Sequence, residues 1–146
     1  MSKTILITGA SSDIGVSLIR RVADDYDHIL AHYAHRADKL LALREELGDK
    51  LLLLQADFSE EASVYGMIDK IQKDGLTPTH ILHLPAERFE LQRFHKLGWD
   101  VFQSGLNISL RSVVLLAQAF LPAMKKARSG KLLIMLSSTV TSKAPK

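Results

Sequence analysis

Short runs of hydrophobic residues alternate along the chain with stretches in which hydrophobic residues recur at helical spacing. Runs with the length and the β-branched or leucine-rich composition of buried strands cover residues 3–8, 28–33, 51–54, 79–84 and 132–136. Between these runs, hydrophobic residues three or four positions apart predict helices over residues 14–22, 40–47, 64–71 and 99–124. The last of these helices contains Pro122, where we expect a bend.

The order of these elements predicts the fold class. The predicted strands are apolar throughout, as is typical of parallel strands that are covered on both faces. Regular alternation of strand and helix predicts an α/β fold, a three-layer Rossmann-like doubly wound parallel sheet. The sequence contains no internal repeat or linker, so we expect residues 1–146 to form a single domain.

Composition narrows the classes of protein that fit. The chain has 146 residues, of which 47% are hydrophobic and 24% charged, and this balance is typical of a soluble globular domain. The absence of cysteine excludes disulfides and thiolate metal sites and fits a reducing compartment. A net charge of +3 with scattered basic residues does not indicate nucleic-acid binding. No apolar run approaches the ~20 residues of a membrane helix. We therefore expect a cytoplasmic protein that binds neither nucleic acid nor membrane.

The segment between the first predicted strand and the first predicted helix carries a glycine turn. Glycines at both ends of this turn permit a tight bend and close packing of the helix, and the main-chain N–H groups at a helix start attract an anion such as a pyrophosphate. The alternative is an ordinary strand–helix turn with a side-chain N-cap from a serine or aspartate. The residues that we expect to contact a nucleotide here are Gly9, Ser11, Ser12, Asp13, Ile14 and Gly15.

Residues 8–15 (TGASSDIG) resemble the TGxxxGxG fingerprint of the short-chain dehydrogenase/reductase family. Three later segments resemble the same family in the same order: residues 55–58 (QADF), residues 99–102 (WDVF) with Asn107, and residues 130–138 (GKLLIMLSS). The resemblance implies that Asp57, with the adjacent Phe58, lies near the adenine of a dinucleotide. It also implies that Asn107 and Ser138 are catalytic.

Two departures from the family pattern affect the expected cofactor site. Asp13 stands where the family usually has its middle glycine, so its carboxylate either turns away from the pyrophosphate or repels it. Residues 84–87 (LPAE) replace the family's NNAG, and of these only Ala86 matches. By resemblance, this segment lines the cofactor cleft and Ala86 contacts the cofactor.

The end of the second predicted strand bears on the choice between NADP and NAD. Dinucleotide folds place an acid there for the ribose 2′-hydroxyl of NAD, or a basic residue nearby for the 2′-phosphate of NADP. Arg36 follows this strand, and its planar charged guanidinium suits a phosphate. We therefore expect NADP as the cofactor, with NAD as the alternative. A second alternative is that Arg36 only begins the exposed face of the next helix.

The family's tyrosine and lysine, which occur as YxxxK after the catalytic serine, are absent from this chain. Tyrosines occur only at positions 26, 33 and 65, all before Ser138. In the family, further strands cover the fifth strand, so the domain is expected to be incomplete at its C-terminal side. The fifth strand should then form an uncovered apolar edge, and this chain alone should be inactive.

These observations favour an NADP-preferring oxidoreductase acting on a small-molecule carbonyl or alcohol, and the resemblance implies a homo-oligomer assembled through the long helix. A non-catalytic nucleotide-binding or interaction protein with a degenerate form of the fold is the alternative, and a relative of sugar-nucleotide epimerases is a weaker one. The sequence has six histidines, which we interpret as structural or surface residues, and we expect no metal site.

Overall fold

The computed structural model describes residues 2–85, 92–137 and 141. The strands are β1 (Thr4–Thr8), β2 (His28–Tyr33), β3 (Leu51–Gln55), β4 (His80–His83) and β5 (Lys131–Ile134). The α-helices are α1 (Asp13–Val22), α2 (Asp38–Leu47), α3 (Glu61–Lys73), α4 (Trp99–Leu106) and α5 (Ser112–Ala127). A π-helical turn, Asn107–Arg111, joins α4 to α5. Short 3₁₀ turns cover Ala23–Asp25, Gly48–Lys50 and Phe94–Lys96.

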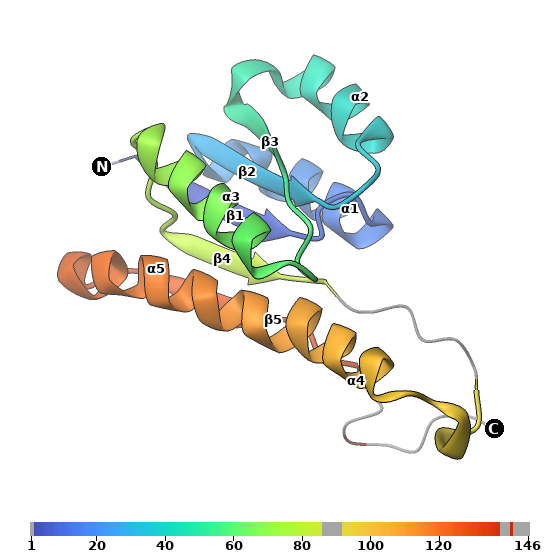
Figure 1. The fold of residues 1–146 in the computed structure, drawn as a ribbon. Coiled ribbons are helices and arrows are strands. Elements are labelled where there is room, and N and C mark those ends of the chain that lie inside the picture. Colours follow the sequence, from blue (N-terminus) through green and yellow to red (C-terminus); the bar gives the residue numbers. More distant parts are fainter. Residues whose placement is uncertain (1, 86–91, 138–140, 142–146) are drawn as a thin grey trace.

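All five strands are parallel and lie in the order β3-β2-β1-β4-β5 (Figure 1). In register, Leu6 of β1 lies between Leu30 of β2 and Ile81 of β4. The strand order reverses at β1, because β2 and β3 extend to one side of it and β4 and β5 to the other. This arrangement confirms the predicted Rossmann-like doubly wound sheet.

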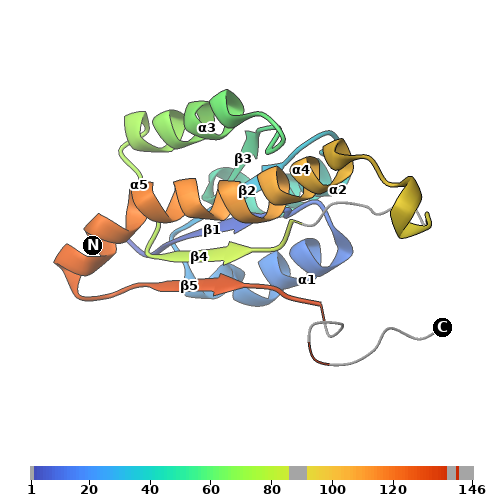
Figure 2. The same cartoon turned by 60° about the horizontal axis from the view of Figure 1, so that its bottom comes forward.

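Helices cover both faces of the sheet because successive strand residues point to opposite sides. Leu6, Leu30 and Ile81 pack with residues of α3 and α5 in one cluster. Ile5, Ile7 and other alternate residues form a second cluster with α1 and α2. Figure 2 shows α3 and α5 on one side of the sheet and α1 on the other. The carboxyl ends of the strands therefore form an edge between two helical layers.

Residues Trp99–Ala127 form one long helix that is interrupted by the π turn. The helix stays α-helical across Pro122, where the sequence suggested a bend, and it departs from α geometry at Asn107–Arg111. The helix has 29 residues, and an 18-residue stretch within it has a mean hydropathy of 1.4, so by length and composition it could cross a membrane and the expectation of no such stretch was wrong by that measure. One such helix is weak evidence for a membrane, and this one packs on the sheet through Leu116 and Phe120.

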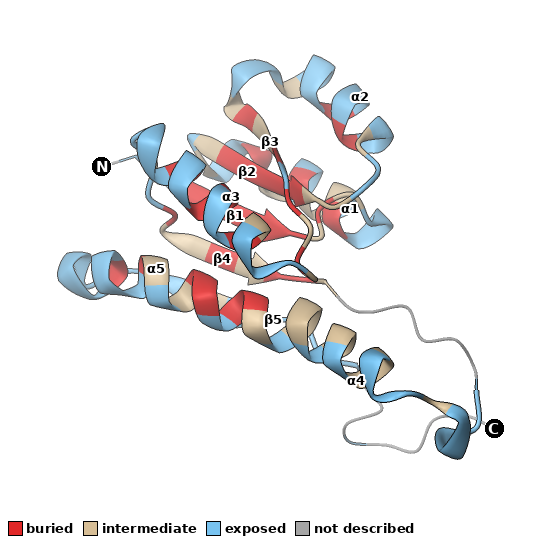
Figure 3. Ribbon diagram, in the orientation of Figure 1, coloured by how far each residue is buried: buried red, intermediate tan, exposed pale blue. Residues whose placement is uncertain are grey.

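Strand β5 is the last strand of the sheet on its side, and two of its three hydrophobic residues are exposed. Figure 3 shows that the buried residues of the sheet gather in the strands before it. Leu133 and Ile134 are 51% and 47% exposed, and Leu136 beyond the strand is 70% exposed. Within the described residues, no strand pairs with the outer edge of β5. The predicted uncovered edge is present.

Candidate cofactor site

The glycine turn follows β1 at the point where the strand order reverses. Gly9 adopts a positive φ of 67°, and a side chain on it would meet the main-chain nitrogen of Pro85, 3.2 Å from the Cβ position. The turn is fixed from β2 as well, because the amide of Ala10 donates to the carbonyl oxygen of His32 at 2.8 Å. The turn thus lies between the ends of β2 and β4, where open α/β sheets bind their ligands.

Gly15 brings the first turn of α1 directly against this loop. A Cβ at Gly15 would lie 2.4 Å from the carbonyl oxygen of Ala10, a distance that no side chain tolerates. Ser12 is the N-cap of the helix: its hydroxyl accepts a hydrogen bond from the Gly15 amide at 3.0 Å and donates to the Gly9 carbonyl at 3.0 Å. One hydroxyl group therefore closes both ends of the turn.

The start of α1 leaves main-chain donors for a ligand. Among the described residues, no acceptor is hydrogen-bonded to the amides of Asp13 and Ile14. These amides carry the positive end of the helix dipole, which favours a bound anion. The side chain of Ile14 is 50% exposed at the same helix end, and Ser11 is partly buried. The geometry fits a pyrophosphate.

Asp13 is held by α2 through an ion pair between its carboxylate and the ammonium group of Lys39. The hydrogen bond and the charge of Lys39 lower the pKa of Asp13 below its usual value, so the carboxylate is ionised at neutral pH. The Asp13 side chain is 90% exposed. The carboxylate therefore lies in solvent beside α2 and does not fill the glycine turn, the first of the two arrangements expected from the sequence.

The segments after β2 and β3 contribute the other described candidates. Arg36 is exposed in the connection from β2 to α2. Asp57 accepts hydrogen bonds from the amide and hydroxyl of Ser59, at 2.9 and 2.7 Å through its Oδ1 atom, and these bonds lower its pKa. Phe58 is only 3% exposed and stacks on His32 with the ring centroids 3.9 Å apart. The ring of Phe58 therefore packs in the core, whereas Asp57 is only partly buried.

Two buried histidines lie toward the carboxyl ends of β2 and β4, the two strands that flank β1, and the ring of Phe58 is parallel to both. His32 accepts a hydrogen bond from the amide of Gly9 at Nδ1 (3.1 Å), so its Nε2 carries the proton and donates to the carbonyl of Ala56 (2.9 Å). The ring of His83 lies 6.3 Å from that of Phe58 and nearly parallel to it. Burial lowers the pKa of each histidine to about 4, so both are neutral at neutral pH.

Asn107 is the first residue of the π turn and is partly buried, and its Oδ1 accepts a hydrogen bond from Nε2 of Gln103 at 3.0 Å. Ala86 and Ser138 lie outside the described residues, so the structure adds nothing on them. Among the described residues, no three His, Asp or Glu side chains are grouped so that they could hold a metal ion.

Sequence reasoning missed three contributors to this region. Lys39 pairs with Asp13 across 26 residues, and no local pattern marks the pair. Arg111 donates from Nη2 to the carbonyl of Ser59 at 2.7 Å and so ties the π turn to the Asp57 segment. His83 was classed only as structural or surface, although its position at the end of a buried strand was visible in the sequence.

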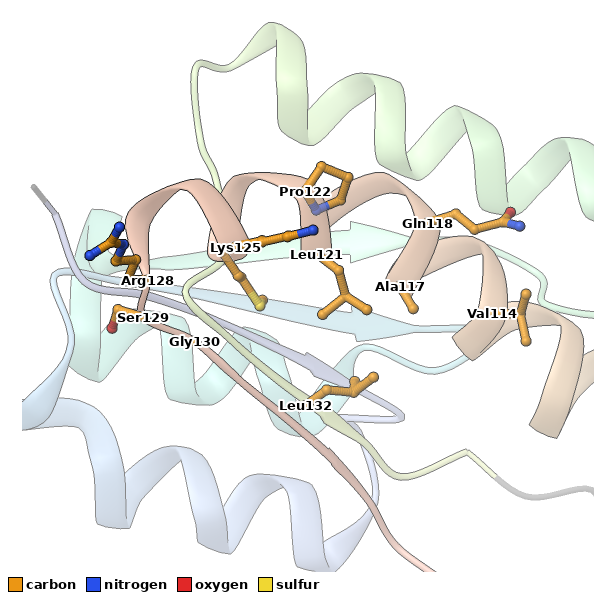
Figure 4. Close-up of a pocket in the computed structure, with 11 residues that line it drawn as sticks. Val114, Ala117, Gln118, Leu121, Pro122, Lys125, Arg128, Ser129, Gly130 and Leu132 are labelled. Carbon is orange, nitrogen blue, oxygen red and sulfur yellow. The ribbon is translucent and has the colours of Figure 1, made fainter.

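A separate hollow is at the other end of the sheet, beside the start of β5 (Figure 4). It is an open groove of about 1040 Å³ between α5 and β5, with Leu121, Met124 and Leu132 among its apolar lining. Because parallel strands start at the edge opposite the glycine turn, this groove is separate from the candidate cofactor site.

The fold and the glycine turn together are those of a class, the α/β proteins that bind a dinucleotide where the strand order reverses. The short chain dehydrogenase family matches residues 3–146, which is nearly the whole chain. The chain belongs to this family.

The relatives are oxidoreductases. The chain is 23% identical over 138 residues to the NADP-dependent 3-hydroxy acid dehydrogenase YdfG of Escherichia coli K12, covering 94% of this chain and 55% of the relative. It is 31% identical over 143 residues to human 17-beta-hydroxysteroid dehydrogenase type 1, covering 92% of this chain and 43% of the relative. The chain thus spans about half the length of these curated relatives.

Solved structures share the fold. A metagenomic short-chain oxidoreductase in complex with NADP superposes with a TM-score of 0.86 at 18% identity, covering 97% of this chain and 65% of the other. Serine dehydrogenase from Escherichia coli gives a TM-score of 0.80 at 20% identity, covering 97% and 64%. At these identities the likeness concerns the fold alone.

Proposed function

We propose that this chain forms the cofactor-binding part of an NADP-preferring oxidoreductase that interconverts a small-molecule carbonyl and an alcohol. The observation that carries the proposal is the glycine turn at the sheet's reversal point, with Gly15 packed against Ala10 and two helix-end amides unpaired within the described residues. Membership of the short chain dehydrogenase family and oxidoreductase relatives support this function over the non-catalytic alternative.

The residues present suit a dinucleotide at distinct points. The amides of Asp13 and Ile14 would hold the pyrophosphate, and Asp57 would face the adenine. Arg36 would bind the 2′-phosphate, with its exposed guanidinium as support and an NADP-dependent relative as a precedent. When bound, the nicotinamide supplies or accepts the hydride. Asn107 and Ser138 are the catalytic residues that we propose within this chain.

The sequence has no tyrosine followed four positions later by lysine beyond Ser138, so we propose that residues 1–146 alone bind cofactor without turning over substrate. A cytoplasmic location, with no membrane or nucleic-acid partner, also belongs to the proposal. It is supported by the lack of cysteine and the small net charge. Assembly into a homo-oligomer is supported by apolar side chains on the outer face of the long helix, such as Leu110 at 55% exposure.

Calorimetric titration of the chain with NADPH and with NADH tests this function. We expect saturable binding of both, with NADPH tighter, and a loss of about tenfold in NADPH affinity for Arg36→Ala, the scale of one charge-assisted contact. The Arg44→Ala variant, which removes another exposed arginine from the C-terminal half of α2, is the control and should leave the affinity unchanged. Absence of binding to either nucleotide contradicts the function, and an unchanged Arg36→Ala variant contradicts only the NADP preference.

A further inference from the structure

His83, the last residue of β4, joins two parts of the molecule that the proposed function treats separately. Its Nδ1 accepts a hydrogen bond from the hydroxyl of Thr8 at 2.8 Å, directly before the glycine turn. Its Nε2 donates to the carbonyl of Ser109 at 3.1 Å, inside the π turn, with the hydroxyl of Ser112 at 3.4 Å. The ring is 2% exposed, so both nitrogens are buried and both have a partner.

The π turn is the place where the long helix gains an additional residue. The amide of Ser112 bonds to the carbonyl of Asn107, five residues back instead of four. The hydroxyl of Ser112 donates to the carbonyl of Ile108 at 2.5 Å. In the widened turn, the Ser109 carbonyl points at His83 and accepts a hydrogen bond from its Nε2. Turns of this kind need a local cause, and they are frequent at functional sites.

We propose that His83 is a positioning residue. Its hydrogen bond to Ser109 stabilises the π turn and so sets the direction in which the Asn107 side chain projects from the helix. The turn is held on a second side by Arg111, whose Nη2 donates to the carbonyl of Ser59. Asn107 opens the turn, so a change from π to α geometry would rotate Asn107 about the helix axis relative to α5. The catalytic role of Asn107 rests on the proposed function, and the link from His83 to the turn does not.

An apolar residue at position 83 could not replace the two hydrogen bonds of the imidazole. A leucine could fill the space, but it would leave the Ser109 carbonyl and the Thr8 hydroxyl buried without this partner. Without the bond from His83, the turn could relax to regular α geometry, and this would move Asn107. The imidazole instead provides an acceptor and a donor at opposite sides of one rigid ring.

The experiment follows Asn107 by NMR in the ¹⁵N-labelled chain, with its side-chain amide signal identified by its loss in Asn107→Ala. The variants are His83→Leu, His83→Asn and His83→Gln. A glutamine amide reaches the position of Nε2 and can donate to Ser109, whereas an asparagine amide reaches only that of Nδ1. We expect the Asn107 side-chain signal to shift in the Leu and Asn variants. Amide exchange of residues 107–112 should become about tenfold faster, the scale of one buried hydrogen bond. In the His83→Gln variant, both the Asn107 signal and the exchange rates should match those of the unsubstituted chain.

A matched buried histidine separates positioning from general loss of stability. His32→Leu also removes a buried imidazole with two hydrogen-bond partners, but these are Gly9 and Ala56 and neither is in the long helix. It should leave the Asn107 signal unchanged. An equal response to His32→Leu and His83→Leu, or a Gln variant that behaves as Asn does, overturns the proposal. If His83→Leu does not fold, the comparison of His83→Asn with His83→Gln is sufficient to test the proposal.

Titration with NADPH keeps this result separate from the proposed function. If the chain binds NADPH but the Asn107 signal is the same in all the His83 variants, the positioning role is refuted and the proposed function is retained. If the chain does not bind NADPH but the Asn107 signal changes with the residue at position 83, the structural link from His83 to the π turn is retained. The catalytic role proposed for Asn107 is then removed.

Discussion

The two sides of the sheet, divided at β1, differ in how completely they are closed. On the β2 and β3 side, Leu30 and Leu51 are at most 1% exposed, and the strand ends are tied to the glycine turn by His32. On the β4 and β5 side, β4 is anchored through His83, but Leu133 in β5 is 51% exposed. The geometry needed to hold a pyrophosphate is therefore built by the closed side together with β4, and it does not depend on a cover for β5.

Acidification should have the largest effect on stability, because a buried histidine lies near a strand end on each side of β1. Each has a folded-state pKa of about 4 against an ordinary value of 6.5, so the unfolded chain binds protons first as the pH falls. The contribution of the two histidines to stability should be complete above pH 6.5 and be lost as the pH drops from there to about 4. The loss is about 3 kcal/mol for each histidine. Urea unfolding at a series of pH values measures it.

The His83→Gln variant is the control for that titration. With one titrating group removed, about half of the pH-dependent loss should disappear. An unchanged pH profile in this variant would show that the dependence arises elsewhere in the chain.

The tightest contact of the closed side predicts the next largest effect. Gly15→Ala places a Cβ 2.4 Å from the carbonyl oxygen of Ala10 and should cost about 3 kcal/mol of unfolding free energy, together with NADPH binding. Gly66→Ala, in α3 with open space around it, is the matched control. It should stabilise the protein by about 0.5–1 kcal/mol. Two variants of equal stability would refute the close packing at Gly15.

The ion pair between Asp13 and Lys39 offers a smaller effect at the same turn. Asp13→Asn removes a negative charge beside the anion site and frees Lys39, so NADPH affinity should rise about threefold at low salt and less at high salt. Asp24→Asn, the same change of charge near the opposite end of α1, should have no effect. A fall in affinity for Asp13→Asn would mean that the carboxylate supports the turn.

A charged substitution on the β4 and β5 side should change the association of the protein with little change in its unfolding free energy. Ile134→Lys puts a charge on the exposed edge strand and should reduce light scattering at high protein concentration, while the unfolding free energy changes by less than about 0.5 kcal/mol. Leu41→Lys, at a similarly exposed position on α2, is the control. If both variants reduce scattering equally, the effect comes from net charge and not from the strand edge.

The strands, their parallel order and the glycine turn could be predicted because they depend on local pattern. Continuous apolar runs identify strands covered on both faces, and Gly9 and Gly15 identify a turn in which side chains have no room. The uncovered edge at β5 was expected for a different reason, because the resemblance to the family supplied a strand order in which further strands cover β5. These features need no knowledge of which distant side chains meet.

The remaining features depend on contacts between distant residues. The direction of Asp13 is decided by Lys39, and the π turn by His83, whose bonds reach 75 residues back to Thr8 and 26 residues ahead to Ser109. The sequence of the long helix predicts α geometry throughout and places its weak point at Pro122 instead. Hydrogen bonds across such separations leave no periodic signal.

The bond between Thr8 and His83 also has a consequence for the order of assembly. The long helix can form from its own residues within microseconds, but local contacts alone favour regular α geometry. The π turn gains its anchor only when β4 has docked beside β1, which closes a loop of 75 residues. Asn107 therefore reaches its final orientation late in folding, and a chain with a loosened β4 would carry an intact helix with this one side chain misdirected.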